Sequence, residues 1–133
     1  MKKIQSQSTS NPCSISQAAA TEALNGPQDC VKQMVVAFKK RHDYLVDALN
    51  TIPGVECIKG DGTFYAFPNF QGAIDAKPEI NNDVEMAEFI LSEAGVALVP
   101  GSAFGAAGCM RLSFATSMET LEEAINRLKK VLV

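Results

Sequence analysis

Residues 95–115 have the sequence GVALVPGSAFGAAGCMRLSFA, from which the centre of the fold is predicted. Its first part, Val96 to Val99, is wholly apolar and predicts a short buried strand. A glycine-rich loop from Pro100 to Gly108 follows, and Met110 to Phe114 then predicts a second strand. The centre of the fold is therefore expected to be two strands joined by this loop.

The second strand places one arginine in a distinctive position. Side chains alternate between the two faces of a strand, so Met110, Leu112 and Phe114 are expected to point into a core. Arg111 then points the other way, among small side chains that leave free space in front of it. A planar guanidinium in such a space matches a carboxylate. An arginine paired with a structural carboxylate, or reaching into solvent, fits the same pattern equally well.

The glycine-rich loop does not match the phosphate-binding motifs GxxxxGK[ST] or GxGxxG. It also leads into a strand, whereas phosphate loops derive their affinity from the N-terminus of a following helix. The loop is therefore either a tight connection between two strands or the wall of a cleft.

Helical patterns lie on both sides of this stretch. Asn82, with Glu85 three residues later, resembles a capping box that opens a helix, and Gly95 ends that helix. Thr116 and Glu119 open a last amphipathic helix in the same way.

Two further strands are expected upstream, at Val55–Ile58 and Thr63–Phe67, joined by a hairpin-like loop over residues 59–62. In the second, alternation places Phe64 on one face and Tyr65 on the other, so that one face packs in the core and the other could line a ligand cleft. Packing alone would also explain the aromatic residues. Residues 69–81 contain turn signals and are expected to form an irregular loop.

The N-terminal part is expected to be helical. Apolar residues recur at helical spacing from Gln28 to Asn50, which predicts one long helix that could bridge two bodies, although a solvated charged face is an equal explanation. Ser14–Leu24 predicts a shorter, alanine-rich helix. The first dozen residues are polar, and residues 1–26 are expected to be the tail of a larger protein. In the separate chain this segment is expected to be mobile or to pack against another copy.

The order of elements is two helices followed by β-β-α-β-β-α, which predicts a small α/β domain with helices on one face of a sheet. The length of 133 residues suits one ordinary domain. The net charge is −3, whereas a dedicated nucleic-acid binder is expected to be basic. No transmembrane helix or signal peptide is predicted.

The side chains that often carry chemistry are sparse. The four cysteines have no metal-ligand spacing and are expected to be reduced and mostly buried in a cytoplasmic protein, with no metal site. The single histidine, His42, stands among charged residues and is expected to be a surface residue. No Ser/His/Asp or Cys/His catalytic arrangement is predicted.

Five stretches resemble, in family order, the C-terminal part of class I aminotransferases, and most closely bacterial aspartate aminotransferases. They are QSQSTSNPCSISQAAATEAL (5–24), FKKRHDYLVDALN (38–50), GTFYAFP (62–68), GVALVPGSAFG (95–105) and MRLSFATS (110–117). The resemblance implies the small C-terminal domain of a fold-type I enzyme that uses pyridoxal 5′-phosphate. Residues 1–26 would be the tail of the large cofactor-binding domain, and residues 27–133 the small domain with its connecting helix.

The resemblance also implies roles for individual residues. Arg111 stands where the family binds the substrate α-carboxylate, and Phe64 and Tyr65 stand where aromatic side chains contact the substrate. Ser6, Ser8 and Thr9 are weaker candidates for the cofactor pocket of the neighbouring subunit in a homodimer.

The activity implied is transfer of an amino group between an amino acid, with aspartate expected, and a 2-oxo acid. The family's cofactor-binding lysine lies in a Ser-Lys motif upstream of QSQSTSNP, and no stretch of residues 1–133 matches it. No catalytic residue is therefore expected here, and the chain by itself is expected to be inactive. The alternative is a stand-alone α/β ligand-binding or dimerisation module without catalysis.

Overall fold

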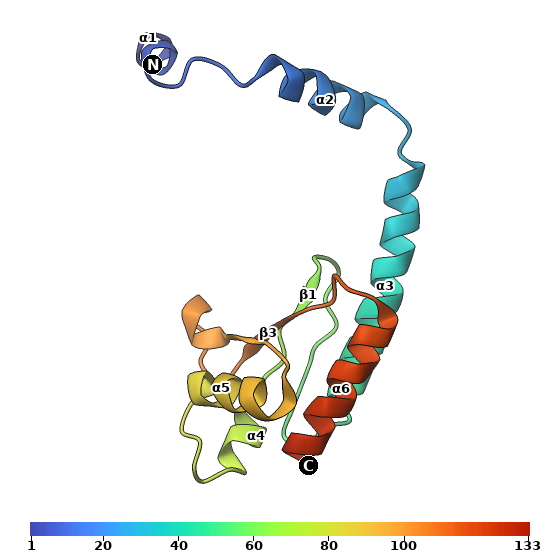
Figure 1. Ribbon diagram of the computed structural model, residues 1–133, viewed down its shortest axis with the longest axis vertical. Coiled ribbons are helices and arrows are strands. Elements are labelled where there is room, and N and C mark those ends of the chain that lie inside the picture. The colour runs from blue at the N-terminus through green and yellow to red at the C-terminus, as the bar shows by residue number, and fades with distance from the viewer. The chain divides into compact units, whose positions relative to one another are not determined.

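The computed structural model describes residues 1–133, which divide into two compact units, Met1–Met34 and Val35–Val133. Its elements are α1 (Lys2–Ser8), α2 (Ser14–Asn25), α3 (Asp29–Leu49), β1 (Tyr65–Ala66), α4 (Gln71–Asp75), α5 (Asp83–Ala94), β2 (Val99–Pro100), the 3₁₀ helix η1 (Gly101–Phe104), β3 (Met110–Ser113) and α6 (Met118–Leu132). Figure 1 labels the helices α1 to α6 and the strands β1 and β3.

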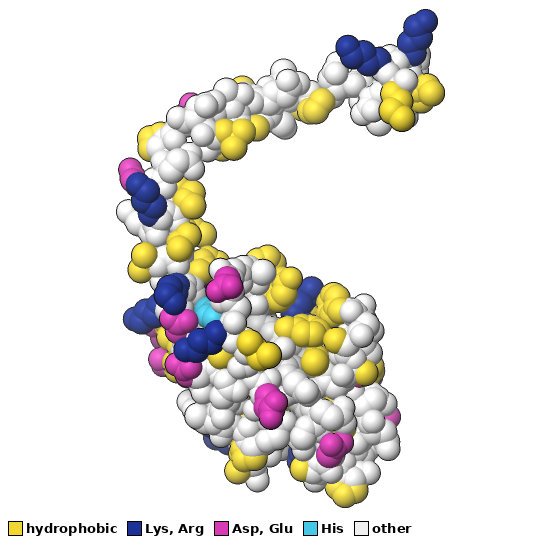
Figure 2. All heavy atoms as spheres, turned by 180° about the vertical axis from the view of Figure 1, so that it is seen from behind, with side chains coloured by type: hydrophobic (Ala, Val, Ile, Leu, Met, Phe, Trp, Pro, Cys, Tyr) yellow, Lys and Arg dark blue, Asp and Glu magenta, His cyan; other side chains and the backbone are white.

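The unit Met1–Met34 is helical and has no core of its own. Helix α2 confirms the predicted alanine-rich helix, and α1 forms in the polar segment before it. Neither helix has a buried residue. Several large apolar side chains of this unit are exposed, and yellow patches follow its helices in Figure 2; they belong to Ile4, Ile15, Leu24, Val31 and Met34.

Helix α3 confirms the predicted long helix to within a residue at each end. Its buried residues all lie in its last two turns, on the face that packs into the unit Val35–Val133; they are His42, Leu45, Val46 and Leu49. After the helix, Gly54 adopts a φ of +76°, a left-handed conformation that glycine reaches without steric cost.

The sheet has three antiparallel strands in the order β1-β3-β2, so the strand that carries Arg111 is central. Tyr65 pairs with Ser113 in β1–β3, and Val99 pairs with Arg111 in β2–β3. The strand predicted at Met110–Phe114 is confirmed. The strand predicted at Val96–Val99 begins only at Val99.

The hairpin predicted around residues 59–62 is wrong. Of the expected strand at Val55–Ile58, only Glu56 makes a bridge, with Asn69. The physical reason is that the following residues bond to side chains of α3 and its C-terminal end instead of to a strand. The backbone N–H and C=O of Cys57 both bond to the side-chain amide of Asn50, at 2.8 and 2.9 Å.

The predicted helix after Asn82 is confirmed as α5. The side-chain oxygen of Asn82 accepts hydrogen bonds from the N–H groups of Val84 and Glu85, both at 3.0 Å. Gly95 ends the helix in a left-handed conformation, with φ of +64°.

Two predictions about the other helices need correction. The last helix, α6, is capped by Ser117 and not by Thr116, since the Ser117 hydroxyl accepts from the N–H of Thr120 at 3.2 Å. The segment 69–81, predicted as an irregular loop, contains the short helix α4. This helix forms because it buries Phe70, Ala73 and Ile74 in the core, a tertiary contribution that turn signals do not reveal.

One hydrophobic core holds the unit Val35–Val133 together. It combines the buried end of α3, one face of α5, one face of α6 and the inner face of β3. Its fully buried large side chains include Leu45, Phe70, Met86, Phe114 and Leu128. The fold is thus the small α/β arrangement that the sequence predicts, with the opposite face of β3 left partly open.

Candidate functional site

Strand β3 places Arg111 on the open face of the sheet. Met110 and Leu112, its neighbours along the strand, are 0% and 6% exposed, whereas Arg111 itself is half-buried. Burial thus alternates along the strand as predicted, and the guanidinium belongs to the face that the core does not occupy.

Two aromatic rings flank the guanidinium. Its carbon Cζ lies 4.8 Å from the centroid of the Phe104 ring and 5.5 Å from that of Tyr65. Each distance is within the range of an attractive cation–π contact, worth about 0.5–1 kcal/mol at exposed positions. A cation–π contact of this kind does not use the N–H groups of the guanidinium as hydrogen-bond donors to another side chain.

No carboxylate of the protein pairs with Arg111. The five salt bridges of the structure involve Lys32, Lys39, His42, Lys59 and Arg127, and none includes Arg111. This observation removes the structural-ion-pair explanation of the residue. A half-buried, unpaired guanidinium with its N–H edge free is suited to a carboxylate brought by a ligand.

Aromatic side chains extend the surface around Arg111. The Phe67 ring lies edge-on to Phe104, with centroids 6.1 Å apart, and the Phe64 ring lies edge-on to Tyr65 at 5.4 Å. Phe64 also anchors the end of β1, since its carbonyl accepts the N–H of Phe114 at 2.8 Å. We call Phe64, Tyr65, Phe67 and Phe104 the aromatic cluster.

The structure therefore brings together three residues singled out from the sequence and two that were not. Arg111, Tyr65 and Phe64 are connected through ring contacts. Phe104 was missed because its glycine-rich loop gave no sign of which side chain would face the strand. Phe67 was missed because nothing in the sequence marked it as a neighbour of Phe104.

The loop that carries Phe104 is a folded element and not merely a connection. Residues Gly101–Phe104 form η1, and Gly101 packs so closely that an added Cβ would lie 2.3 Å from the carbonyl oxygen of Ala106. Within η1, the N–H of Ser102 donates to the carboxylate Oδ2 of Asp83 at 2.7 Å. The loop presents the Phe104 side chain to Arg111, and its interpretation as the wall of a cleft stays a prediction.

Asp83 is a buried carboxylate that sequence reasoning did not find, and it is only 2% exposed. Burial acts to raise its pKa, but hydrogen bonds from Ser102, and from the amides of Asp83 itself and of Gly108, outweigh burial and hold the pKa below its ordinary value. Its partners lie 19 and 25 residues away in sequence, so no local pattern could have revealed it.

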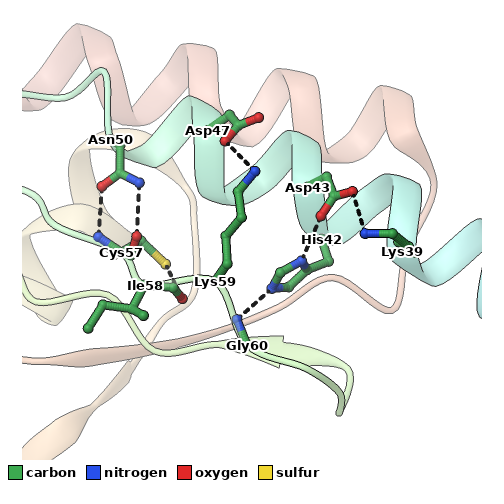
Figure 3. Close-up of polar contacts among 9 residues, drawn as sticks. All are labelled: Lys39, His42, Asp43, Asp47, Asn50, Cys57, Ile58, Lys59 and Gly60. Atoms are coloured by element: carbon green, nitrogen blue, oxygen red, sulfur yellow. Dashed lines mark hydrogen bonds and ion pairs between the residues drawn. The ribbon is translucent and has the colours of Figure 1, made fainter.

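His42 is buried, so its assignment as a surface residue is wrong. The ring Nε2 accepts the backbone N–H of Gly60 at 3.1 Å, and Nδ1 lies 3.2 Å from Oδ1 of Asp43 (Figure 3). The ring also packs edge-on against Phe114. Asp43 in turn contacts Lys39, and these two neighbours lower the pKa of the Asp43 carboxyl, Lys39 more than His42. These contacts give His42 a structural role.

The cysteines are less buried than predicted. All four are free thiols, but Cys13 and Cys30 are exposed and only Cys57 is buried. Cys57 is a small apolar residue of the core, and its burial there raises the pKa of its thiol.

The candidate cofactor residues lie in the unit Met1–Met34. Ser6, Ser8 and Thr9 are all exposed. The hydroxyl of Ser6 donates to the carbonyl of Lys3 at 3.0 Å and that of Thr9 to the carbonyl of Gln5 at 3.3 Å. These bonds stay within one helical turn and direct no group toward an anion.

The described residues do not by themselves fit pyridoxal phosphate. That cofactor needs an amine for its aldehyde, donors for its phosphate and a partner for its ring nitrogen. The side chains that contact Arg111 are aromatic rings, and they supply none of these groups.

None of the helices combines the length and the run of apolar residues needed to cross a membrane.

Comparison with known proteins identifies the family. The model of aminotransferase class I and II matches residues 1–128. An aspartate/prephenate aminotransferase of Nitrosomonas europaea is 48% identical over 99% of this chain and 34% of that protein. An aspartate aminotransferase of Rhizobium meliloti is 43% identical over 96% of this chain and 32% of that protein.

The solved structures agree. The aspartate aminotransferase from Rhizobium meliloti superposes with a TM-score of 0.89 and 42% identity, covering 97% of this chain and 33% of that one. An alanine aminotransferase from Pyrococcus furiosus superposes with a TM-score of 0.79 and 39% identity, covering 86% of this chain and 28% of that one. The chain thus spans about a third of the length of the relatives it matches, and over that length it belongs to the class I and II aminotransferase family, whose members use pyridoxal phosphate.

Proposed function

We propose that this chain supplies the substrate-carboxylate site of a pyridoxal-phosphate-dependent aminotransferase that moves an amino group from aspartate to a 2-oxo acid. Residues 27–133 would form the small C-terminal domain with its connecting helix, and residues 1–26 the tail of the cofactor-binding domain. The enzyme would act as a cytoplasmic homodimer. Aspartate is favoured because several relatives are named as aspartate aminotransferases.

One observation carries the proposal. The guanidinium of Arg111 is half-buried, lies against two rings and has no protein carboxylate to neutralise it. A charge kept partly out of water without a partner costs stability. A ligand carboxylate would neutralise it through two parallel charge-assisted hydrogen bonds.

The chemistry of amino transfer belongs to the cofactor, and the role of the present residues is to bind and orient. Arg111 would fix the α-carboxylate, which removes rotational freedom from the bound amino acid. Tyr65 and Phe104 would hold the guanidinium plane in place, and Phe64 and Phe67 would exclude water from its surroundings. Ser6, Ser8 and Thr9 stay candidates for a contact with the neighbouring subunit's cofactor.

A chimeric enzyme tests the proposal. Residues 1–133 would replace the matching third of the Rhizobium meliloti aspartate aminotransferase, with which the chain shares 42% of its residues. We expect a folded chimera that binds pyridoxal phosphate and transaminates aspartate. A folded, cofactor-loaded chimera without transaminase activity would contradict the proposal and favour a module without catalysis.

The separate 133-residue chain supplies the complementary measurement. Pyridoxal phosphate followed by borohydride reduction should label no single lysine stoichiometrically, because the cofactor-binding motif of the family is absent from these residues. Stoichiometric labelling of one lysine together with turnover would show that these residues hold a complete site.

A further inference from the structure

Asp83 joins two elements that the sequence separates. It is the first residue of α5, and its carboxylate Oδ2 accepts the N–H of Ser102 in η1 at 2.7 Å. The residue is almost fully buried, yet the structure leaves no buried side-chain oxygen without a partner. A buried carboxylate satisfied by backbone N–H groups acts as a fixed link between chain segments.

The linked segment carries one wall of the candidate site. Ser102 and Phe104 both belong to η1, and the Phe104 ring lies 4.8 Å from the guanidinium carbon of Arg111. Phe104 is itself half-exposed and contacts Phe67 edge-on. Its ring therefore owes little of its position to burial, and the placement of η1 has to supply the rest.

The start of η1 is held by backbone contacts, since the N–H of Gly101 donates to the carbonyl of Cys109 at 2.7 Å. Gly105 ends the helix at a φ of +76° with open space around it, and the N–H of Gly105 bonds to Ser102 within the same turn. The bond from Ser102 to Asp83 is the side-chain hydrogen bond that reaches from η1 to another element. Removing the carboxylate should therefore loosen the part of η1 that follows Gly101 and presents Phe104.

We infer that Asp83 is a positioning residue for substrate binding: it fixes η1 so that Phe104 lies against the guanidinium of Arg111. The inference rests on the proposed function, in which Arg111 binds the α-carboxylate. Asp83 acts through η1 and does not itself contact the carboxylate. Its loss should weaken substrate binding more than it slows turnover.

The first test uses the 133-residue chain and does not require activity. The Phe104 ring should shift the Arg111 side-chain Nε–H resonance through its ring current. We expect Asp83→Ala to abolish most of this shift and Asp83→Asn, which keeps an acceptor oxygen, to retain part of it. Glu85→Gln is the matched control, because Glu85 lies in the same helical turn but bonds only to Asn81 and Asn82.

The second test uses the chimeric enzyme. Asp83→Ala should raise the KM for aspartate at least fivefold and leave kcat within twofold. The effects of Asp83→Ala and Phe104→Ala on KM should not add, because both variants remove the same ring contact. Additive effects would assign Asp83 a general stabilising role only. The same conclusion would follow if Glu85→Gln changed kcat and KM as much as Asp83→Ala does.

The two tests separate the inference from the proposed function. A folded Asp83→Ala chain with an unchanged Arg111 resonance overturns the inference, whatever the chimera does. Should Asp83→Ala fail to fold, the same comparison is made with Asp83→Asn, and an unchanged resonance there has the same meaning. A chimera insensitive to Arg111→Lys contradicts the proposed function, while the resonance comparison still decides the role of Asp83.

Discussion

The Arg111 guanidinium carbon lies 4.8 Å from the centroid of the Phe104 ring, although the two residues belong to different elements separated by a turn with two positive-φ glycines. Strand alternation alone directs Arg111 away from the core. The contact with Phe104 additionally requires η1 to fold back over the strand. The candidate site is therefore made by a strand and a helical turn together.

Gly54 should tolerate substitution far less than Gly105, although both have a φ of +76°. A Cβ on Gly54 would lie 2.5 Å from the backbone N of Ala73, whereas a Cβ on Gly105 would meet nothing within 4 Å. Gly105→Ala should cost about 1–2 kcal/mol of unfolding free energy for the left-handed conformation alone. Gly54→Ala should cost about 1–3 kcal/mol more, for the forced displacement of backbone.

Urea denaturation of both variants measures this difference directly. Because the two φ values match, the difference isolates the close approach of Gly54 to α4. Equal losses of stability would mean that residues 72–73 do not pack against Gly54 as the structure shows.

His42 should carry its ring proton on Nδ1, because Nε2 accepts the N–H of Gly60. Nitrogen chemical shifts of the imidazole measure the tautomer directly. In His42→Ala, hydrogen exchange at the Gly60 amide should accelerate. The Cys57 amide is the internal control, because its N–H donates to the side-chain oxygen of Asn50, and it should keep its protection. A proton on Nε2, or an unchanged Gly60 exchange rate, would contradict the contact drawn in Figure 3.

Asp83 should stabilise the folded chain in a pH-dependent manner. Its pKa in the folded state lies below the unfolded value, so its contribution is present above the unfolded pKa and is lost as pH falls through the folded pKa. Unfolding free energies of the wild-type chain and of Asp83→Asn should therefore differ at pH 7, and the difference should shrink below about pH 4. A difference that stays constant between pH 7 and pH 3 would show that the charge of Asp83 contributes nothing.

Local patterns predicted the elements whose signals are local. Helix α5 has its cap at Asn82 and its glycine stop at Gly95, both readable from neighbouring residues. The direction of Arg111 follows from alternation within one short strand. The fold class then follows from the order of the elements.

The failures all involve partners distant in sequence. Helix α4 forms because Phe70 and Ile74 enter a core built mostly by other segments. Residues 57–60 bond to the side chains of α3 and Asn50, so the expected hairpin does not form. His42 is buried by Phe114, which lies 72 residues further along the chain. No window of neighbouring residues contains these contacts.

The same division between local and distant contacts holds for the candidate site. Arg111 and Tyr65 could be found from alternation and resemblance. Phe104 and Asp83 could not, because their roles depend on where η1 folds and on a hydrogen bond that spans 19 residues.

The kcat/KM of an Arg111→Lys chimera for aspartate tests directly whether Arg111 binds the substrate carboxylate. Lysine keeps the charge but cannot form two parallel hydrogen bonds with a carboxylate. Losing such a pair at an interface costs about 2–5 kcal/mol, so kcat/KM should fall roughly 100-fold or more, at about 1.36 kcal/mol per factor of ten. Cofactor absorbance should be unchanged. Arg127→Lys, which alters an exposed arginine paired with Glu123, is the control and should leave kcat/KM nearly unaffected. If Arg111→Lys stays within about threefold of the unmodified chimera, a loss below ~0.7 kcal/mol, Arg111 does not bind the substrate carboxylate.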